Sequence, residues 1–213
     1  MVPNDREKIY TGKQLRDYVA DASNLKRRDC YTKLTQFLKN TKSKRVFSLC
    51  GLRRTGKSTM AAQAICDMSP DQFDKTCFIA AEQYKDMDEL YHDIDQLYQQ
   101  GYEYFFIDEI TALSDFIPRS AFLSNKYGWL GKKVVLTGTD SLSFIMVGAD
   151  SLYDRQELVR TSYIPFSEFT RLLGIKEIDT YIRYGGTLVQ ETEDGNPDFS
   201  SSPFATRLLW AST

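Results

Sequence analysis

The chain has 213 residues, 42% of them hydrophobic and 26% charged, a composition typical of a globular domain with one well-buried core. It lacks the run of about 18 apolar residues that a membrane helix needs, and its first ten residues, MVPNDREKIY, lack the apolar segment of a secretory signal. We therefore expect no membrane span and no secretory leader. The four cysteines form no C-x-x-C pair, which favours a reduced, cytoplasmic protein over a disulfide or zinc scaffold.

The formal net charge of −2 conceals an uneven distribution of charge along the chain. Residues 26–57 hold eleven lysines and arginines and one acid, whereas residues 67–115 hold thirteen acids and two lysines. These stretches are either two solvated faces of opposite sign or a positive surface suited to phosphates or an acidic partner. Few aromatic residues, chiefly Tyr31 and Phe37, are interspersed among the basic ones, so nucleic acid as a partner stays open.

The first predicted element is a helix over residues 24–39, where apolar side chains recur at helical spacing after an N-cap at Ser23 or Asn24. Four short apolar runs follow, at 45–50, 77–81, 104–108 and 133–138. They are apolar almost throughout, which strands of a parallel sheet require because helices cover both faces of such a sheet.

Helical patterns lie between these strands. One follows Lys57, and another runs over residues 87–98 and ends before Gly101. We expect a fifth strand at 158–164 and a helix at 167–174 that ends at its glycine. This alternation predicts an α/β fold, namely a doubly wound parallel sheet with helices on both faces.

The first strand leads into the stretch LCGLRRTGKST, whose glycines, lysine and serine satisfy the pattern G-x-x-x-x-G-K-[ST]. Glycines let the backbone curl so that its N–H groups point at phosphate oxygens, and the following helix directs its positive end at the same anion. An ordinary turn is the alternative, but the strand before and the helix after favour a P-loop. The residues predicted to bind the nucleotide are Gly51, Arg53, Arg54, Thr55, Gly56, Lys57, Ser58 and Thr59.

Two adjacent acids, Asp108 and Glu109, end the apolar run YFFIDEI. An aspartate at the end of such a strand can hold hydrated Mg²⁺ together with the hydroxyl of Ser58, so these two residues are the predicted metal site. The glutamate is predicted to orient and polarise the attacking water, with Lys57 neutralising charge on the phosphates. The alternative is a strand that simply ends in two solvent-facing acids.

Two features of the sequence favour ATP over GTP. The extra strand pattern at 77–81, between the P-loop and the paired acids, fits ATPases of the additional-strand, catalytic-glutamate type. The guanine-specific signal N-K-x-D is not evident, because SNKYG at 124–128 has glycine where an aspartate is needed, and we read this stretch as a loop.

The fourth apolar run ends in LTGTDS, where a polar side chain of such folds reaches the γ-phosphate or the attacking water. Thr137 and Thr139 are both candidates, and a strand-end turn is the alternative. Arg155 and Arg160 are each candidates for a charge-neutralising residue that acts within or between subunits, and Arg155 is the one that we predict. Arg155 and Arg160 are equally compatible with structural ion pairs.

Together these motifs make the chain resemble prokaryotic AAA+-like P-loop ATPases that usually carry an uncharacterised C-terminal domain. The stretches GLRRTGKST, YFFIDEI, VVLTGTDSLS, DRQELVRTSYIPFSEFTRLLG and YIRYGG follow in the family's order, and PFSEF narrows the match. The resemblance covers about residues 40–186 and implies a strand order of 5-1-4-3-2, with ATP at the carboxyl edge of the sheet. Two departures are Thr139, where a serine is usual, and the apparent loss of the long C-terminal domain.

These patterns predict an N-terminal helical segment at 1–40, a P-loop ATPase domain at 41–184, and an irregular tail or the start of a truncated domain at 185–213. The predicted function is Mg²⁺-dependent ATP binding and hydrolysis, coupled to an unidentified protein partner or to self-assembly. Two alternatives stay open: an ATP-gated interaction module with negligible hydrolysis, and a small-molecule kinase, for which no lid cluster stands out.

Overall fold

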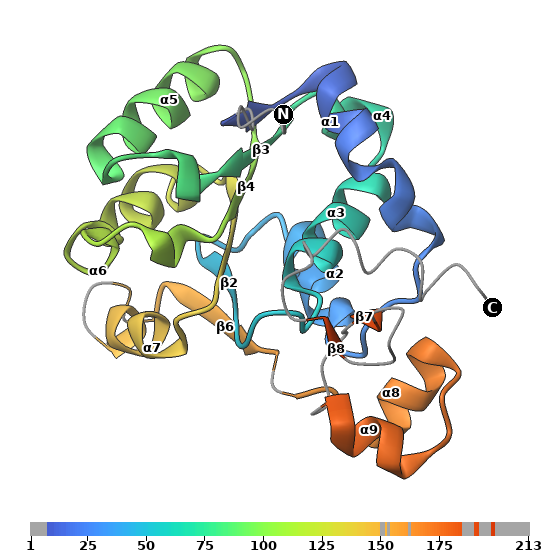
Figure 1. Cartoon of the computed structure of the whole chain (residues 1–213). Coiled ribbons are helices and arrows are strands. Elements are labelled where there is room, and N and C mark those ends of the chain that lie inside the picture. Colours follow the sequence, from blue (N-terminus) through green and yellow to red (C-terminus); the bar gives the residue numbers. More distant parts are fainter. Residues whose placement is uncertain are drawn as a thin grey trace, which may run out of the picture.

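The computed structural model describes residues 8–149, 152, 154–161, 163–184, 190–191 and 197–198. Its centre is a six-stranded sheet in the order β1-β3-β4-β5-β2-β6 (Figure 1). The strands are β1 Ile9–Tyr10, β2 Val46–Cys50, β3 Thr76–Ala80, β4 Tyr104–Asp108, β5 Lys133–Gly138 and β6 Gln156–Arg160. All pairs are parallel except β1 with β3.

The five parallel strands, numbered along the chain, lie in the order 5-1-4-3-2, which confirms the predicted topology. Each predicted apolar run forms a strand within one or two residues of the predicted limits. The fifth strand, β6, begins and ends earlier than the predicted 158–164. Every residue of β2 and of β5 is buried, as expected for strands covered on both faces.

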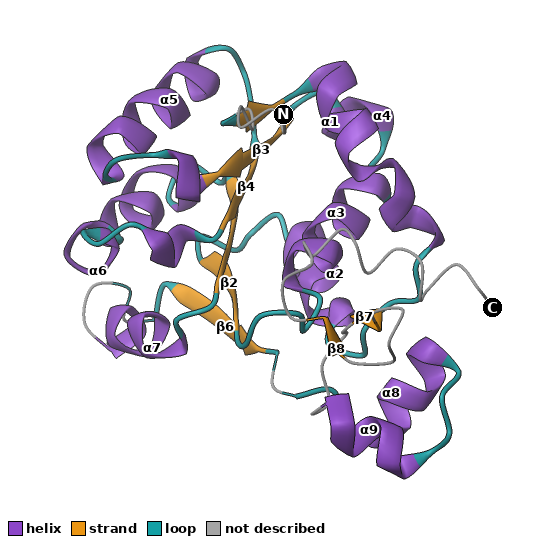
Figure 2. Ribbon diagram, viewed as in Figure 1, coloured by secondary structure: helices purple, strands orange, loops and turns teal. Residues whose placement is uncertain are grey.

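Helices cover both faces of the sheet (Figure 2). They are α1 Gly12–Val19, α2 Tyr31–Lys39, α3 Lys57–Cys66, α4 Pro70–Phe73, α5 Met87–Gln99, α6 Phe116–Arg119, α7 Ser141–Ala149, α8 Phe166–Leu173 and α9 Ile178–Tyr184. Helices α5, α6 and α7 lie on one face, and α1 to α4 lie on the other. Short 3-10 turns cover Ala20–Asn24, Ala81–Gln83 and Ile110–Ala112.

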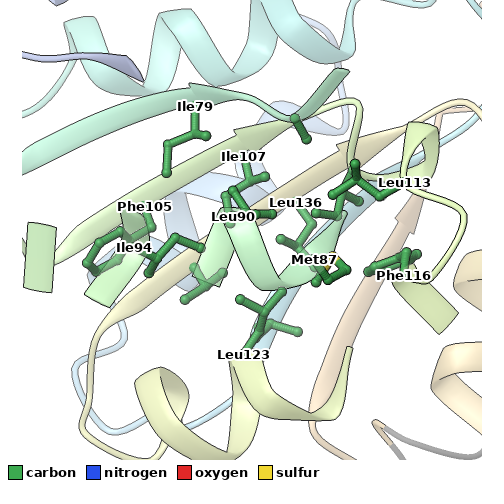
Figure 3. Close-up of a cluster of buried hydrophobic side chains, with 14 of the residues drawn as sticks. Ile79, Met87, Leu90, Ile94, Phe105, Ile107, Leu113, Phe116, Leu123 and Leu136 are labelled. Atoms are coloured by element: carbon green, nitrogen blue, oxygen red, sulfur yellow. The ribbon is translucent and has the colours of Figure 1, made fainter. Parts of the chain in front are cut away.

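Each face of the sheet has its own apolar core. On the α5 face, Leu90 and Ile94 of the helix point at Ile107 and Leu136 of the strands, all of them buried (Figure 3). On the opposite face, Phe47 and its neighbours pack against α1, α2 and α3. The buried apolar side chains of residues 8–40 thus belong to the same core as the sheet, and the predicted domain limit at residue 40 stays a prediction.

The predicted helix at 24–39 is wrong in its first half, because α2 begins only at Tyr31. Residues 25–30 are held in a non-helical path by contacts with distant elements: the Leu25 carbonyl accepts a hydrogen bond from Gln63 Nε2 at 2.9 Å. The loop predicted at 124–128 is also wrong, since Leu123–Gly128 is a π-helical turn with Tyr127 fully buried.

Helices α8 and α9 stand apart from α5, α6 and α7 in Figure 1 and have a small apolar cluster of their own. Helix α8 ends at Gly174 with a left-handed backbone (φ 76°), as the sequence predicted. Beyond α9, residues Gln190–Glu191 (β7) and Pro197–Asp198 (β8) pair as an antiparallel ladder, and the rest of the predicted tail lies outside the described residues. Among the described helices, none is long and apolar enough to cross a membrane.

Candidate functional site

The loop between β2 and α3 has the curled backbone that its glycines predict. Gly51, Arg54 and Gly56 all have positive φ angles, of 149°, 63° and 83°. At Gly51 the loop passes so close to the end of β6 that a Cβ atom would lie 2.5 Å from the carbonyl oxygen of Thr161. The loop therefore needs glycine for both backbone conformation and space at this point.

Lys57, the first residue of α3, turns its ammonium group back into the loop. Its Nζ donates to the carbonyl oxygens of Gly51 at 2.9 Å and of Leu52 at 2.8 Å, and the residue is only 6% exposed. Burial lowers the pKa of this ammonium, while the nearby carboxylates of Glu109 and Asp108 act in the opposite direction. A buried cation thus lies within the curve of the loop, beside two acids.

Asp108 connects three elements at the carboxyl edge of the sheet. Its carboxylate accepts hydrogen bonds from Ser58 Oγ at 2.9 Å to each oxygen, and from the hydroxyl of Thr137. Burial raises the pKa of this carboxyl group, although the Thr137 and Ser58 hydroxyls counteract that effect. Asp108 is half-buried and bonds to two hydroxyls, so it does not simply face solvent, and its role at a metal stays a prediction.

Glu109 follows with a left-handed backbone (φ 55°) that aims its side chain differently from that of Asp108. Its Oε1 accepts hydrogen bonds from the Thr139 backbone N–H at 2.9 Å and from the Thr139 hydroxyl, with Thr111 Oγ1 at 3.4 Å. The two candidate threonines are thus both at the site but bind different carboxylates. Thr137 donates to the Asp108 carboxylate and accepts from the Glu109 backbone N–H at 3.2 Å, whereas Thr139 donates to the Glu109 carboxylate. The sequence left this choice open.

The remaining loop residues differ in where their side chains lie. Thr55 is fully buried, and its hydroxyl is bonded to Leu52 O at 2.9 Å and to the Thr161 hydroxyl at 2.8 Å. Its side chain therefore anchors the loop to β6, and only its backbone stays a predicted phosphate contact. Arg53 is exposed, whereas Arg54 and Thr59 are half-buried; their predicted roles stay predictions.

Two residues that the sequence analysis missed brace the loop from outside. Arg28 donates from Nη1 to the Thr55 carbonyl at 2.6 Å, and its Nε and Nη2 donate to Glu168 at 2.6 and 3.2 Å. Glu168 belongs to the PFSEF stretch that narrowed the family resemblance, so a signal for it existed. Arg28 carried no signal beyond its place in a basic stretch.

Arg155 does not come to this site within its own chain. Its backbone carbonyl accepts from Val46 N–H at the amino end of β2, whereas the loop follows Cys50 at the carboxyl end. Four residue-to-residue steps along β2 separate the two points, roughly 13 Å. The Arg155 side chain donates instead to Asn125. A role within the subunit is therefore wrong, and a role between subunits stays a prediction. Arg160, in register with Cys50, is the arginine at the loop end of β6.

The residues present fit a nucleotide with Mg²⁺. Within the described residues, no group of three or more His, Cys, Asp or Glu side chains could hold a metal ion. One carboxylate and one hydroxyl, Asp108 and Ser58, meet instead beside a buried lysine. Mg²⁺ is commonly bound in this way, through one or two protein oxygens plus the phosphates of a substrate.

Comparisons with known proteins agree with this geometry. A protein-family model described as an AAA domain matches residues 43–170, more than half of the chain. No curated protein matches the sequence significantly. A solved structure of the S. cerevisiae Hsp104:casein complex is similar over 80% of this chain and 33% of that chain, with 15% identity and a TM-score of 0.52. At this identity the similarity shows a shared fold.

Two further solved structures have lower TM-scores. C. elegans PCH-2 has 17% identity and a TM-score of 0.44 over 87% of this chain and 51% of that chain. AMPPCP-bound DnaA from Aquifex aeolicus has 12% identity and a TM-score of 0.47 over 73% and 55%. Both TM-scores are too low to carry an argument. This chain spans from a third to just over half of the length of these three proteins.

Proposed function

The chain belongs to the AAA domain family of P-loop ATPases, and from this premise we propose that it binds ATP with Mg²⁺ and hydrolyses it. Family membership supports nucleotide binding and ATPase activity in general terms. The observation that carries the finer proposal is the convergence of a buried lysine, a hydroxyl and two carboxylates where the loop meets the sheet edge.

Each residue has a distinct part in the proposed reaction. The loop N–H groups and Lys57 bind the β- and γ-phosphates, and Ser58 with Asp108 holds Mg²⁺, which supplies positive charge to the phosphate oxygens. Glu109 orients and polarises the water that attacks the γ-phosphate in line. Thr137 and Thr139 fix the two carboxylates in these separate roles, since each threonine donates to a different carboxylate.

Two substitutions test binding and hydrolysis separately. Lys57→Ala is expected to abolish tight ATP binding, because it removes the buried ammonium group that lies inside the loop's curve. Glu109→Gln is expected to keep ATP binding and lose turnover, because an amide cannot accept the water's proton. Binding is measured by titration calorimetry and turnover by phosphate release. Equal turnover by wild-type and Glu109→Gln proteins removes the hydrolytic assignment.

A specific contact favours a second candidate, an ATP-gated interaction module with negligible hydrolysis. Oε1 of Glu109 already accepts hydrogen bonds from Thr139 and Thr111, so the carboxylate is not free to reorient. A stoichiometric MgATP complex that persists for hours without forming ADP supports this candidate. Rapid ADP formation under the same conditions excludes it.

The proposal also covers the cellular compartment and the partners of the protein. All four cysteines are free thiols, which supports a reducing compartment such as the cytoplasm. We further propose that ATP turnover is coupled to a protein partner or to self-assembly. Size-exclusion chromatography with light scattering, run with MgADP and with a non-hydrolysable ATP analogue, tests the self-assembly; a single mass in both conditions counts against it.

A further inference from the structure

The pair of Arg28 and Glu168 lies outside the nucleotide loop but contacts it. Both side chains are almost fully buried, 5% and 4% exposed, and they form a two-point ion pair across 140 residues of sequence. Glu168 Oε1 also accepts from the Asp29 backbone N–H at 2.8 Å. A charged pair buried at this depth is costly to desolvate, so a purely apolar contact would stabilise the fold at least as well.

What the pair does locally is to fix one peptide group of the loop. With two of its nitrogens on Glu168, Arg28 has Nη1 left to donate to the Thr55 carbonyl at 2.6 Å. Because the Thr55–Gly56 peptide is trans and planar, its N–H points opposite to its C=O. A carbonyl held toward Arg28 therefore directs the Gly56 N–H away from it.

Arg28 adds little net positive charge to the loop. Glu168 neutralises its charge at contact distance, so the pair adds little net positive potential for phosphates. The Thr55 side chain is held independently by Thr161. Arg28 therefore acts on the direction of the peptide and not on the field, which distinguishes it from Lys57.

The pair also joins two parts of the chain to the loop at once. Arg28 lies in the non-helical stretch before α2, and Glu168 lies in the first turn of α8. Helix α8 has a small apolar cluster of its own and is tied to the same stretch by Arg171, whose Nη2 donates to Asp29 at 2.6 Å. The orientation of α8 and the shape of the loop are therefore connected through polar contacts.

We propose that Arg28 and Glu168 are positioning residues that set the affinity of the loop for phosphate by orienting the Thr55–Gly56 peptide. This inference rests on the proposed nucleotide binding. It assigns to the PFSEF stretch a role in holding the nucleotide loop from outside.

The test compares MgADP affinity by titration calorimetry in Glu168→Gln and Arg28→Lys, which keep size and remove the two-point contact. We expect both to bind MgADP about tenfold or more weakly, with kcat changed much less than KM, since a hydrogen bond to a charged group is lost. Hydrogen exchange of the loop amides is expected to be faster in the nucleotide-free variants. Arg27→Ala, which removes the exposed ion pair with Asp67, is the matched control and should leave both readouts unchanged.

A charge-swapped variant, Arg28→Glu with Glu168→Arg, separates positioning from stability. It restores an ion pair, but a glutamate at position 28 cannot donate to the Thr55 carbonyl. We expect recovered thermal stability without recovered affinity. The proposal is overturned if the single variants fold, bind MgADP with wild-type affinity and exchange their loop amides at the wild-type rate. It is also overturned if the charge-swapped variant recovers both thermal stability and MgADP affinity.

The outcomes also distinguish this inference from the proposed function. A wild-type protein that binds no MgADP overturns the nucleotide site itself. Loop exchange in the nucleotide-free variants then still reports whether Arg28 and Glu168 fix the loop. If the single variants do not fold, unchanged loop exchange in the swapped protein overturns the inference.

Discussion

Replacement of Gly51 by alanine is the sharpest test of the loop geometry. An added Cβ would meet the Thr161 carbonyl oxygen and hydroxyl at 2.5 Å and the carbonyl carbon at 3.0 Å. Thr161 cannot easily retreat, because its N–H donates to the Cys50 carbonyl at 2.7 Å and its hydroxyl is shared with Thr55. The φ angle of 149° is also one that alanine rarely adopts.

The expected cost follows from these two effects. Overpacking against a fixed backbone and an unfavourable φ angle together reduce the free energy of unfolding by about 3 kcal/mol. For a chain of this size, that lowers the melting temperature by roughly 6–12 °C. MgADP affinity should fall as well, because relief of the contact moves the loop away from β6.

Thermal unfolding followed by circular dichroism measures the effect, and Gly131→Ala is the control. Gly131 also has a positive φ, of 75°, but a Cβ there would meet nothing within 4 Å. The loss of stability in the control therefore reports only the cost of a positive φ angle for alanine, about 1 kcal/mol. Equal losses of stability in the two variants would refute the close approach of the loop to Thr161.

Two further predictions concern the carboxylates. Thr139→Ala is expected to lower ATP turnover about tenfold while leaving MgADP affinity within about twofold, since it removes the hydroxyl that bonds to Glu109 and does not touch the loop. Phosphate release and calorimetry measure this, and unchanged turnover contradicts it. Chelation of Mg²⁺ by EDTA is expected to weaken nucleotide binding in the wild type and much less in Ser58→Ala, which lacks the hydroxyl that we propose binds the metal. Equal metal dependence in both proteins counts against the Ser58–Asp108 site.

The parallel strands and the loop could be predicted because their signals are local. Strands β2 to β5 are apolar almost throughout, and the loop pattern is confined to eight residues between a strand and a helix. Strand β6, with the sequence QELVR, is mostly polar, and its limits were predicted less well. The strand order came from the family resemblance and not from the patterns themselves. The structure confirms the strands and their order.

The elements that the sequence analysis missed lack such local signals. Helix α1 lies within the segment 1–40 that was predicted to be helical, but its limits were missed because it begins with glycine and buries only Leu15 and Val19, too few for a visible period. Strand β1 is two residues long and exists through its pairing with β3. The late start of α2 depends on contacts of residues 25–30 with α3 and α8, which only the folded chain brings together.

The same distinction applies within the site. Lys57, Ser58, Asp108 and Glu109 follow from motifs with fixed spacing, whereas the partner of each threonine depends on side-chain directions at two adjacent strand ends. The contact of Arg28 with the loop joins residues far apart in sequence, so spacing could not indicate it.

Arg155 and the nucleotide loop lie at opposite ends of strand β2, and this placement has a consequence for enzyme kinetics. A guanidinium at the amino end of the sheet can assist hydrolysis only in a neighbouring molecule. If Arg155 contributes in this way, ATP turnover per molecule must rise with protein concentration. Dilution below the dissociation constant of the assembled molecules would leave each molecule with the slow rate that its own residues provide.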